Sequence, residues 1–92
     1  TVEGVLYRGQ VVLSSAGRDR GGRMAVLGAA PDGGILIADG RRRPLQHPKR
    51  KNPRHLTPTG FTVSEASMAT NRELRRALAA LEAAPDPSQE GG

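Results

Sequence analysis

The sequence predicts a mainly β fold, a small antiparallel barrel followed by a short C-terminal α-helix. Short aliphatic runs separated by turn residues occupy the first half of the chain. A helix-capping pattern and leucines at helical spacing follow in the second half. The length of 92 residues allows one small domain, and with one Tyr and one Phe its core must consist of aliphatic side chains.

Four segments of the first half have the composition of β-strands. They are residues 10–14 (QVVLS), 23–28 (RMAVLG), 34–38 (GILIA) and 41–47 (RRRPLQH). In the second segment, Met24 and Val26 should share one face, and Ala25 and Leu27 the other. The fourth should lie at a sheet edge or break, because Pro44 cannot donate to a ladder. Residues 54–57 (RHLT) are expected to add a short closing strand.

Turn signals join these segments. Pro31-Asp32-Gly33-Gly34 predicts a tight turn, and Asp39-Gly40 a hairpin loop leading into residues 41–47. Residues 49–53 (KRKNP) are expected to form a basic loop. Short strands joined by tight turns are typical of a barrel of the SH3-like kind, whose closure hides strand edges.

The second half changes character. Residues 59–68 are expected to be irregular. Thr70 to Glu73 then match a capping box, and Leu74, Leu78 and Leu81 predict a helix over about residues 71–84 that Pro85 ends. The expected organisation is therefore a barrel over residues 1–58, a linker and helix over residues 59–84, and a disordered tail over residues 85–92.

Charge is distributed unevenly along the chain. The formal net charge is +5, but residues 8–55 carry +8 and residues 56–92 carry −2. A concentrated positive region is the electrostatic signature of a polyanionic partner. Arginine is far more frequent than lysine, and arginine suits bidentate phosphate contacts.

Residues 14–23 (SSAGRDRGGR) are rich in glycine and arginine. Their G-x-x-x-x-G spacing matches part of a phosphate-binding P-loop, but Arg23-Met24 stands where Lys-Ser/Thr should follow. A P-loop also opens a helix, whereas the next run here is β-like. The remaining interpretations are a plain hairpin loop and a loop that grips nucleic acid.

Other kinds of site lack the residues they need. The chain has no cysteine, and His47 and His55 have no carboxylate pair nearby to complete a metal site. A polyproline-binding groove needs more aromatic residues than this chain has. We therefore expect no catalytic residue, cofactor or metal. With neither cysteine nor an apolar run of membrane-spanning length, no membrane partner and a cytoplasmic location are expected.

Three stretches carry a resemblance to a known family. Residues 9–21 (GQVVLSSAGRDRG) resemble the KOW motif, a strand, a basic glycine-containing loop and a returning strand. Residues 35–59 and the helix-forming TNRELRRAL at residues 70–78 are similar to bacterial KOW-domain RNA-binding proteins. These are relatives of the large-subunit ribosomal proteins of the L-fourteen-e type. The resemblance covers roughly residues 8–84 and implies an SH3-like barrel that binds RNA, generally ribosomal RNA.

A physical account of RNA binding agrees with this resemblance. Glycines let a backbone approach phosphates closely, and the arginines beside them can hold those phosphates. Because aromatic residues are scarce, we expect recognition of the shape and phosphates of structured RNA rather than base stacking. The candidate RNA-binding residues are Ser15, Gly17, Arg18, Asp19, Arg20, Arg23, Arg41, Arg42, Arg43, Lys49, Arg50, Lys51, Asn52, Arg54 and His55.

Two functions remain open from the sequence. The first is non-catalytic binding of ribosomal RNA in the large subunit, as a ribosomal or ribosome-associated protein beside neighbouring ribosomal proteins. The alternative is a module of a transcription or translation factor whose barrel contacts protein, as some KOW domains do.

Overall fold

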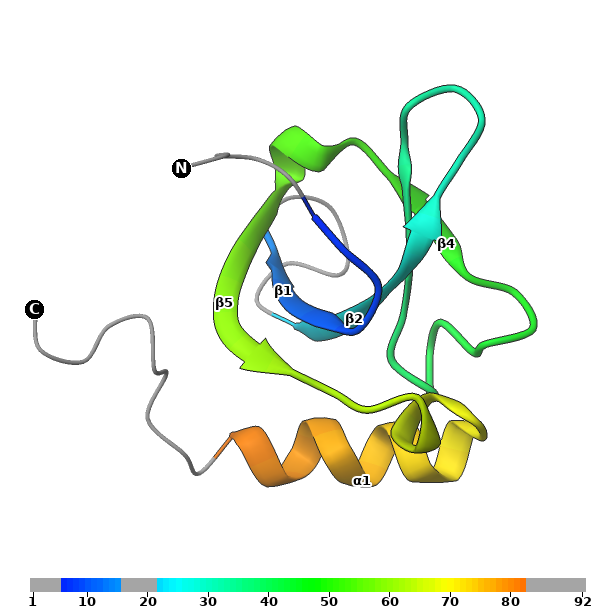
Figure 1. The fold of residues 1–92 in the computed structure, drawn as a ribbon, viewed down its shortest axis with the longest axis vertical. Helices are drawn as coiled ribbons and strands as arrows, with labels where there is room; N and C mark the ends of the chain where they lie inside the picture. The colour runs from blue at the N-terminus through cyan, green and yellow to red at the C-terminus, as the bar shows by residue number, and fades with distance from the viewer. Residues whose placement is uncertain (1–5, 16–21, 83–92) are drawn as a thin grey trace, which may run out of the picture.

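A computed structural model describes residues 6–15 and 22–82, and its strands form one antiparallel sheet (Figure 1). The elements are β1 (Gln10–Ser14), β2 (Arg23–Ala29), β3 (Ile35–Ala38), β4 (Lys49–Lys51), the 3₁₀ helix η2 (Pro53–His55), β5 (Leu56–Thr62), the 3₁₀ helix η3 (Ala66–Met68) and α1 (Asn71–Leu81). The sheet has five strands in the order β4-β3-β2-β1-β5. The prediction of a mainly β fold with a C-terminal helix is confirmed.

The central strands pair in the register that their apolar pattern requires. Val12 lies opposite Met24, and Val26 lies opposite Ile37. The predicted turn at residues 31–34 joins β2 to β3, with Gly33 at a φ of +92° and Asp32 Oδ1 accepting from the Gly34 N–H at 3.1 Å. Strands β1 and β2 pair with each other, so the stretch between Ser14 and Arg23 connects two adjacent antiparallel strands.

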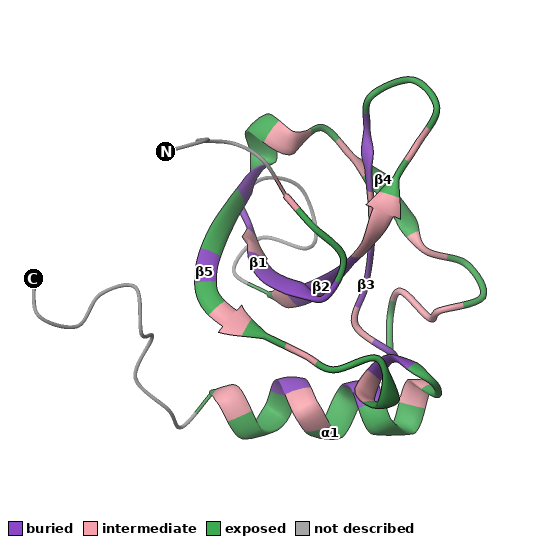
Figure 2. Ribbon diagram, in the orientation of Figure 1, coloured by how far each residue is buried: buried purple, intermediate pink, exposed green. Residues whose placement is uncertain are grey.

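Two apolar clusters cover the two faces of the sheet. One consists of Val12, Met24, Val26, Ile35, Ile37 and Leu56. The other consists of Val11, Ala25, Ala38, Met68, Leu74 and Leu78, and so joins the sheet to η3 and α1. Since β1, β2 and β3 contribute to both clusters, these strands are buried on both faces, and Figure 2 colours much of β1 and β2 as buried. The predicted alternation of Met24 and Val26 against Ala25 and Leu27 is confirmed.

Helix α1 lies along the outer face of the sheet. It begins as predicted, because the Thr70 side chain accepts a hydrogen bond from the Glu73 N–H at 3.1 Å. Leu74 and Leu78 are buried and Leu81 is half-buried, while the opposite side of the helix is exposed (Figure 2). Ala25 and Ala38 stand in the same cluster, and such small side chains leave room for the helix to approach the sheet.

The prediction of a returning strand at residues 41–47 is wrong. After β3 the chain forms an irregular loop, and the strand that pairs with β3 is β4, at Lys49–Lys51, where a basic loop was expected. Pro44 and Pro48 cannot donate ladder hydrogen bonds, and both lie in the irregular stretch. The strand that pairs with β3 therefore begins only after Pro48.

The short closing strand predicted at residues 54–57 is confirmed for Leu56 and Thr57, but the prediction that residues 59–68 are irregular is wrong for residues 59–62, which continue this strand, and for residues 66–68, which form η3. Strand β5 runs from Leu56 to Thr62 and pairs with β1, so the expected barrel boundary at residue 58 falls inside a strand. Pro58 and Gly60 lower the strand propensity of this segment. An edge strand tolerates both, because only one of its sides needs ladder donors.

Helix α1 is too short to cross a membrane, and none of the other described segments is a helix long and apolar enough to do so. The expected tail at residues 85–92, like the expected last helical residues 83 and 84, lies outside the described ranges.

Leu74→Ala should destabilise the fold markedly. Leu74 is 0% exposed at the centre of the helix–sheet cluster. Removal of a fully buried leucine side chain costs about 2–5 kcal/mol of unfolding free energy. Urea denaturation checks this, with Arg76→Ala on the exposed side of α1 as the control, which should change stability by less than about 0.5 kcal/mol. Equal stabilities of the two variants would contradict the packing described here.

Candidate nucleic-acid interface

The glycine- and arginine-rich loop leaves β1 beside η2. The Ser15 N–H donates to the His55 carbonyl at 2.9 Å, and the Ser14 N–H donates to Gly22 at 3.2 Å. Ser15 and His55 are exposed. Gly17, Arg18, Asp19 and Arg20 lie outside the described residues, so the structure fixes only where their loop begins and ends.

Arg23 is the first residue of β2 and lies directly after this loop. It is half-buried and stands opposite Leu13 in the β1–β2 register. Its Nε atom is buried and has no hydrogen-bond partner among the described residues. A buried donor without an acceptor costs free energy, so this atom is the kind of group that a ligand can satisfy.

The Arg41–Arg43 segment is held by a turn built on Asp39. Asp39 Oδ1 accepts from the backbone N–H groups of Arg41 and Arg43, at 2.8 and 2.9 Å. The Arg43 carbonyl accepts from the N–H groups of Asp39 and Gly40. Asp39 thus stabilises this turn, and the side chains of Arg41 and Arg42 are exposed while Arg43 is half-buried.

Helix α1 positions this arginine loop. Gly40 has a φ of +78°, and a Cβ atom there would lie 2.5 Å from the Asn71 carbonyl oxygen, so only glycine fits. The Asn71 side chain accepts from the Leu45 N–H at 2.7 Å and donates to Gln46 at 2.8 Å. Arg75 donates to the Gly40 carbonyl at 2.8 Å. The loop is therefore fixed at both its beginning and its middle by the first turns of the helix.

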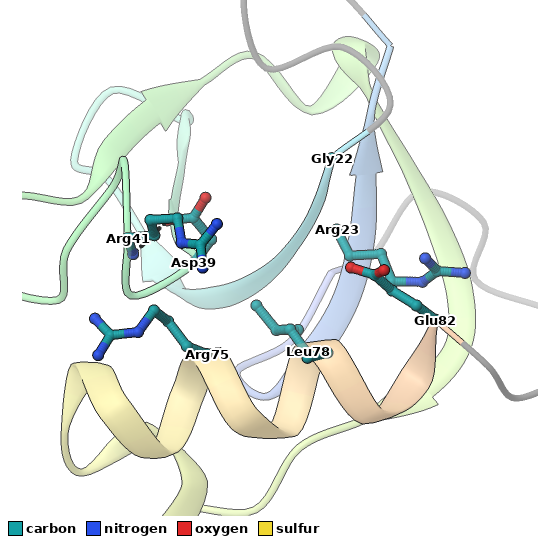
Figure 3. A pocket seen from close by; sticks show the side chains of 8 residues that line it. Gly22, Arg23, Asp39, Arg41, Arg75, Leu78 and Glu82 are labelled. Carbon is teal, nitrogen blue, oxygen red and sulfur yellow. Dashed lines mark hydrogen bonds between the residues drawn. The ribbon is translucent and has the colours of Figure 1, made fainter.

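A groove of about 240 Å³ lies between α1 and the part of the sheet where β2 begins and β3 ends (Figure 3). Its lining consists of Gly22, Arg23, Asp39, Arg41, Arg75, Leu78, Ala79 and Glu82. Arginines thus meet here from β2, from the loop after β3 and from α1. Gly22 places the end of the β1–β2 loop at the same groove.

The cations of β4 lie elsewhere. Arg50 Nε donates to both oxygens of Asp32, at 3.0 and 2.8 Å, and the Arg50 side chain lies over Gly34. Arg50 therefore neighbours the β2–β3 turn, whereas Arg41 follows the opposite end of β3 (Figure 1). Lys49 and Lys51 stand opposite Ile37 and Ile35, on the other face of β4 from Arg50.

The last candidate residues belong to η2. The Asn52 side chain accepts from the Arg54 N–H at 3.0 Å and so caps this short helix. Arg54 and His55 are exposed, and the Ser15–His55 hydrogen bond places them beside the start of the β1–β2 loop. Asn52, expected from the sequence to contact RNA, therefore has a structural role as the cap of η2.

The structure brings the candidates together in two groups that flank one loop. Ser15, Arg54 and His55 adjoin its beginning, and Arg23 and Arg41 adjoin its end. Arg75 belongs to the second group and was missed from the sequence, because it lies in the acidic half of the chain. The sequence did hold a signal for Arg75, because it follows Leu74 directly and precedes Leu78 by three residues. This spacing places Arg75 next to the buried side of α1.

Acidic and histidine side chains are dispersed over the described part of the chain. No group of three or more that could hold a metal ion occurs within residues 6–15 and 22–82.

Comparison with known proteins leaves the chain without an assigned relative. No family model matches it. No curated protein matches it either.

Asp32→Asn should weaken the dependence of stability on acid pH. The hydrogen bond from Arg50, followed by that from the Gly34 N–H, lowers the pKa of Asp32 from its ordinary value of 3.8. A carboxyl group with a lowered pKa in the folded state stabilises the protein above its unfolded-state pKa, and that contribution is lost as the pH falls through the folded-state pKa.

Unfolding monitored between about pH 6 and about pH 2.5, a range that spans the ordinary aspartate pKa, measures this effect. The variant should lose less stability below about pH 4 than the unmodified protein, and high salt should reduce the difference because both partners are exposed. Asp39→Asn is an unsuitable control, since Asp39 holds the arginine loop; Glu73→Gln, exposed on α1, is preferable. Identical pH profiles for the Asp32→Asn variant and the unmodified protein would contradict the ion pair.

Proposed function

We propose that this protein binds structured RNA without catalysis, through the β1–β2 loop and the two groups of cations that flank it. The observation that carries the proposal is the meeting of Arg23, Arg41 and Arg75 from three separate elements at one groove. Cations gathered from distant parts of a chain make a surface for a polyanion, whereas cations spread evenly mainly provide solubility.

The position of the β1–β2 loop supports the same function. The loop of the KOW-like stretch begins beside η2 and ends at the groove, so both of its ends adjoin exposed or half-buried cations. Glycine residues, which the sequence places in this loop, allow a backbone to approach phosphate oxygens closely. We further propose that the curled sheet is an SH3-like barrel of the KOW kind, since its five-strand antiparallel order with η2 before β5 suits that architecture.

Ribosomal RNA of the large subunit is the proposed target. The resemblance to KOW-domain proteins favours it, and folded ribosomal RNA offers phosphates in a fixed arrangement that a rigid basic surface can match. The cytoplasm is the proposed location, because such RNA is found there.

Arg18→Ala/Arg20→Ala and Arg41→Ala/Arg42→Ala should each weaken RNA binding to a similar degree for different RNA sequences. Each lost phosphate contact should also lower the slope of log affinity against log salt by about 0.7–0.9. Fluorescence anisotropy at several salt concentrations measures both quantities.

The matched control is Arg72→Ala/Arg76→Ala, which removes the same charge from exposed positions of α1 that do not line the groove. This variant should keep most of the affinity and slope. If the control loses as much of both as the test variants, net charge rather than the proposed surface governs binding.

Sedimentation of a cell extract through a sucrose gradient should place the protein with the large ribosomal subunit. Ribonuclease treatment should release it, because the contact is with RNA. Sedimentation with RNA polymerase would instead support a factor whose barrel contacts protein, and a protein found only at the top of the gradient would contradict both.

A further inference from the structure

The groove beside α1 differs chemically from a plain basic surface. Asp39, Arg41 and Arg75 lie at one end, Arg23 and Glu82 at the other, and Leu78 lies between them (Figure 3). Leu78 is 6% exposed and Ala79 is exposed, so the middle of the groove is apolar. Phosphate binding alone needs neither an apolar middle nor an acidic group.

The charges of the groove suit a ligand that carries one negative charge. Three arginines and two carboxylates line it, which leaves a net charge of one positive unit. At the first end, Asp39 Oδ1 is already occupied by two backbone N–H groups, and Arg75 is oriented by the Gly40 carbonyl. Arg41 and Arg75 therefore supply the positive charge at this end of the groove.

The second end can both accept and donate hydrogen bonds. Glu82 is exposed and lines this end of the groove, so its carboxylate can accept hydrogen bonds. Arg23 holds the buried Nε donor that has no acceptor within residues 6–15 and 22–82. A ligand group offering two adjacent donors next to an acceptor would complement this pair of side chains.

We propose that this groove receives one unpaired guanosine nucleotide of the bound RNA, with its phosphate at Arg41 and Arg75 and its base over Leu78 and Ala79. The inference rests on the proposed RNA binding and adds a base-specific subsite to it. The N1–H and amino groups of guanine meet the Glu82 carboxylate, and its O6 accepts from Arg23. Adenine, cytosine and uracil do not present two adjacent donors on that edge.

The size of the groove agrees with a single base. Its volume of about 240 Å³ lies below the range of roughly 300–1,000 Å³ that is typical of sites for drug-sized ligands. Unpaired bases in loops and bulges are the parts of RNA that proteins read by their edges, because the deep groove of an RNA helix hides them.

The first test uses the full chain and single nucleotides. In ¹⁵N-labelled protein, guanosine monophosphate should shift the amide resonances of Arg23, Arg41, Ala79 and Glu82, and the other three ribonucleoside monophosphates should do so at least about tenfold more weakly. Equal shifts from all four, or from inorganic phosphate alone, would overturn the guanine assignment.

The second test blocks the groove without touching the core. Ala79→Trp places a large side chain in the lining, and Ala80→Trp places the same side chain at an exposed helix position outside it. For an RNA hairpin with one bulged guanosine, Ala79→Trp should lower affinity about tenfold, as expected for the loss of one base contact, and Ala80→Trp should have less than about a twofold effect. Glu82→Gln should reduce the preference for the bulged guanosine over a bulged uridine.

The two proposals fail in different ways. RNA binding that weakens with salt but is equal in the Ala79→Trp and Ala80→Trp variants would overturn the subsite and leave the proposed function standing. Guanosine monophosphate bound in the groove of a protein that binds no RNA would overturn the proposed function and support a guanine nucleotide site.

Discussion

Packing of α1 against the outer face of the sheet, through Leu74 and Leu78, is the interaction on which the rest of the structure depends. It buries the second face of strands that are too few to form a large core alone. The same contact brings Asn71 and Arg75 to the loop after β3, and Gly40 permits it because no side chain separates the loop from the helix. The apolar contact that stabilises the fold therefore also orients Arg41 and forms the groove.

Local signals accounted for the elements that the sequence predicted well. The first three strands carry aliphatic runs bounded by glycine or proline, and Thr70 with Glu73 identifies the start of the helix. Strand β4 was misplaced because its residues are cationic and resemble a loop. Strand β5 was predicted only in its first two residues, because Pro58 and Gly60 disfavour a strand locally and only the pairing with β1 makes the rest of the segment extended. Such pairing depends on residues more than 40 positions away, which no local pattern records.

The candidate site was predictable in composition but not in arrangement. Charge along the sequence identified the basic segments, yet it grouped Arg41 with Arg50, which the structure places at opposite ends of β3. It also assigned α1 to an acidic half and so overlooked Arg75. The net charge of a segment does not show which of its charged residues lie together, because a helix brings residues 3 or 4 positions apart to the same side.

The two edge strands have a consequence for how copies of this protein behave when crowded. A basic protein that gathers on a polyanion reaches a high local concentration, and exposed strand edges would then join neighbouring copies into aggregates. Strand β4 is three residues long and consists of Lys49, Arg50 and Lys51, and β5 contains Pro58. The positive charges of β4 repel the β4 strand of another copy. Pro58 lacks the backbone N–H group that a strand pairing with the free edge of β5 would need. The features that made these two strands hard to recognise thus also disfavour pairing between the edges of neighbouring copies.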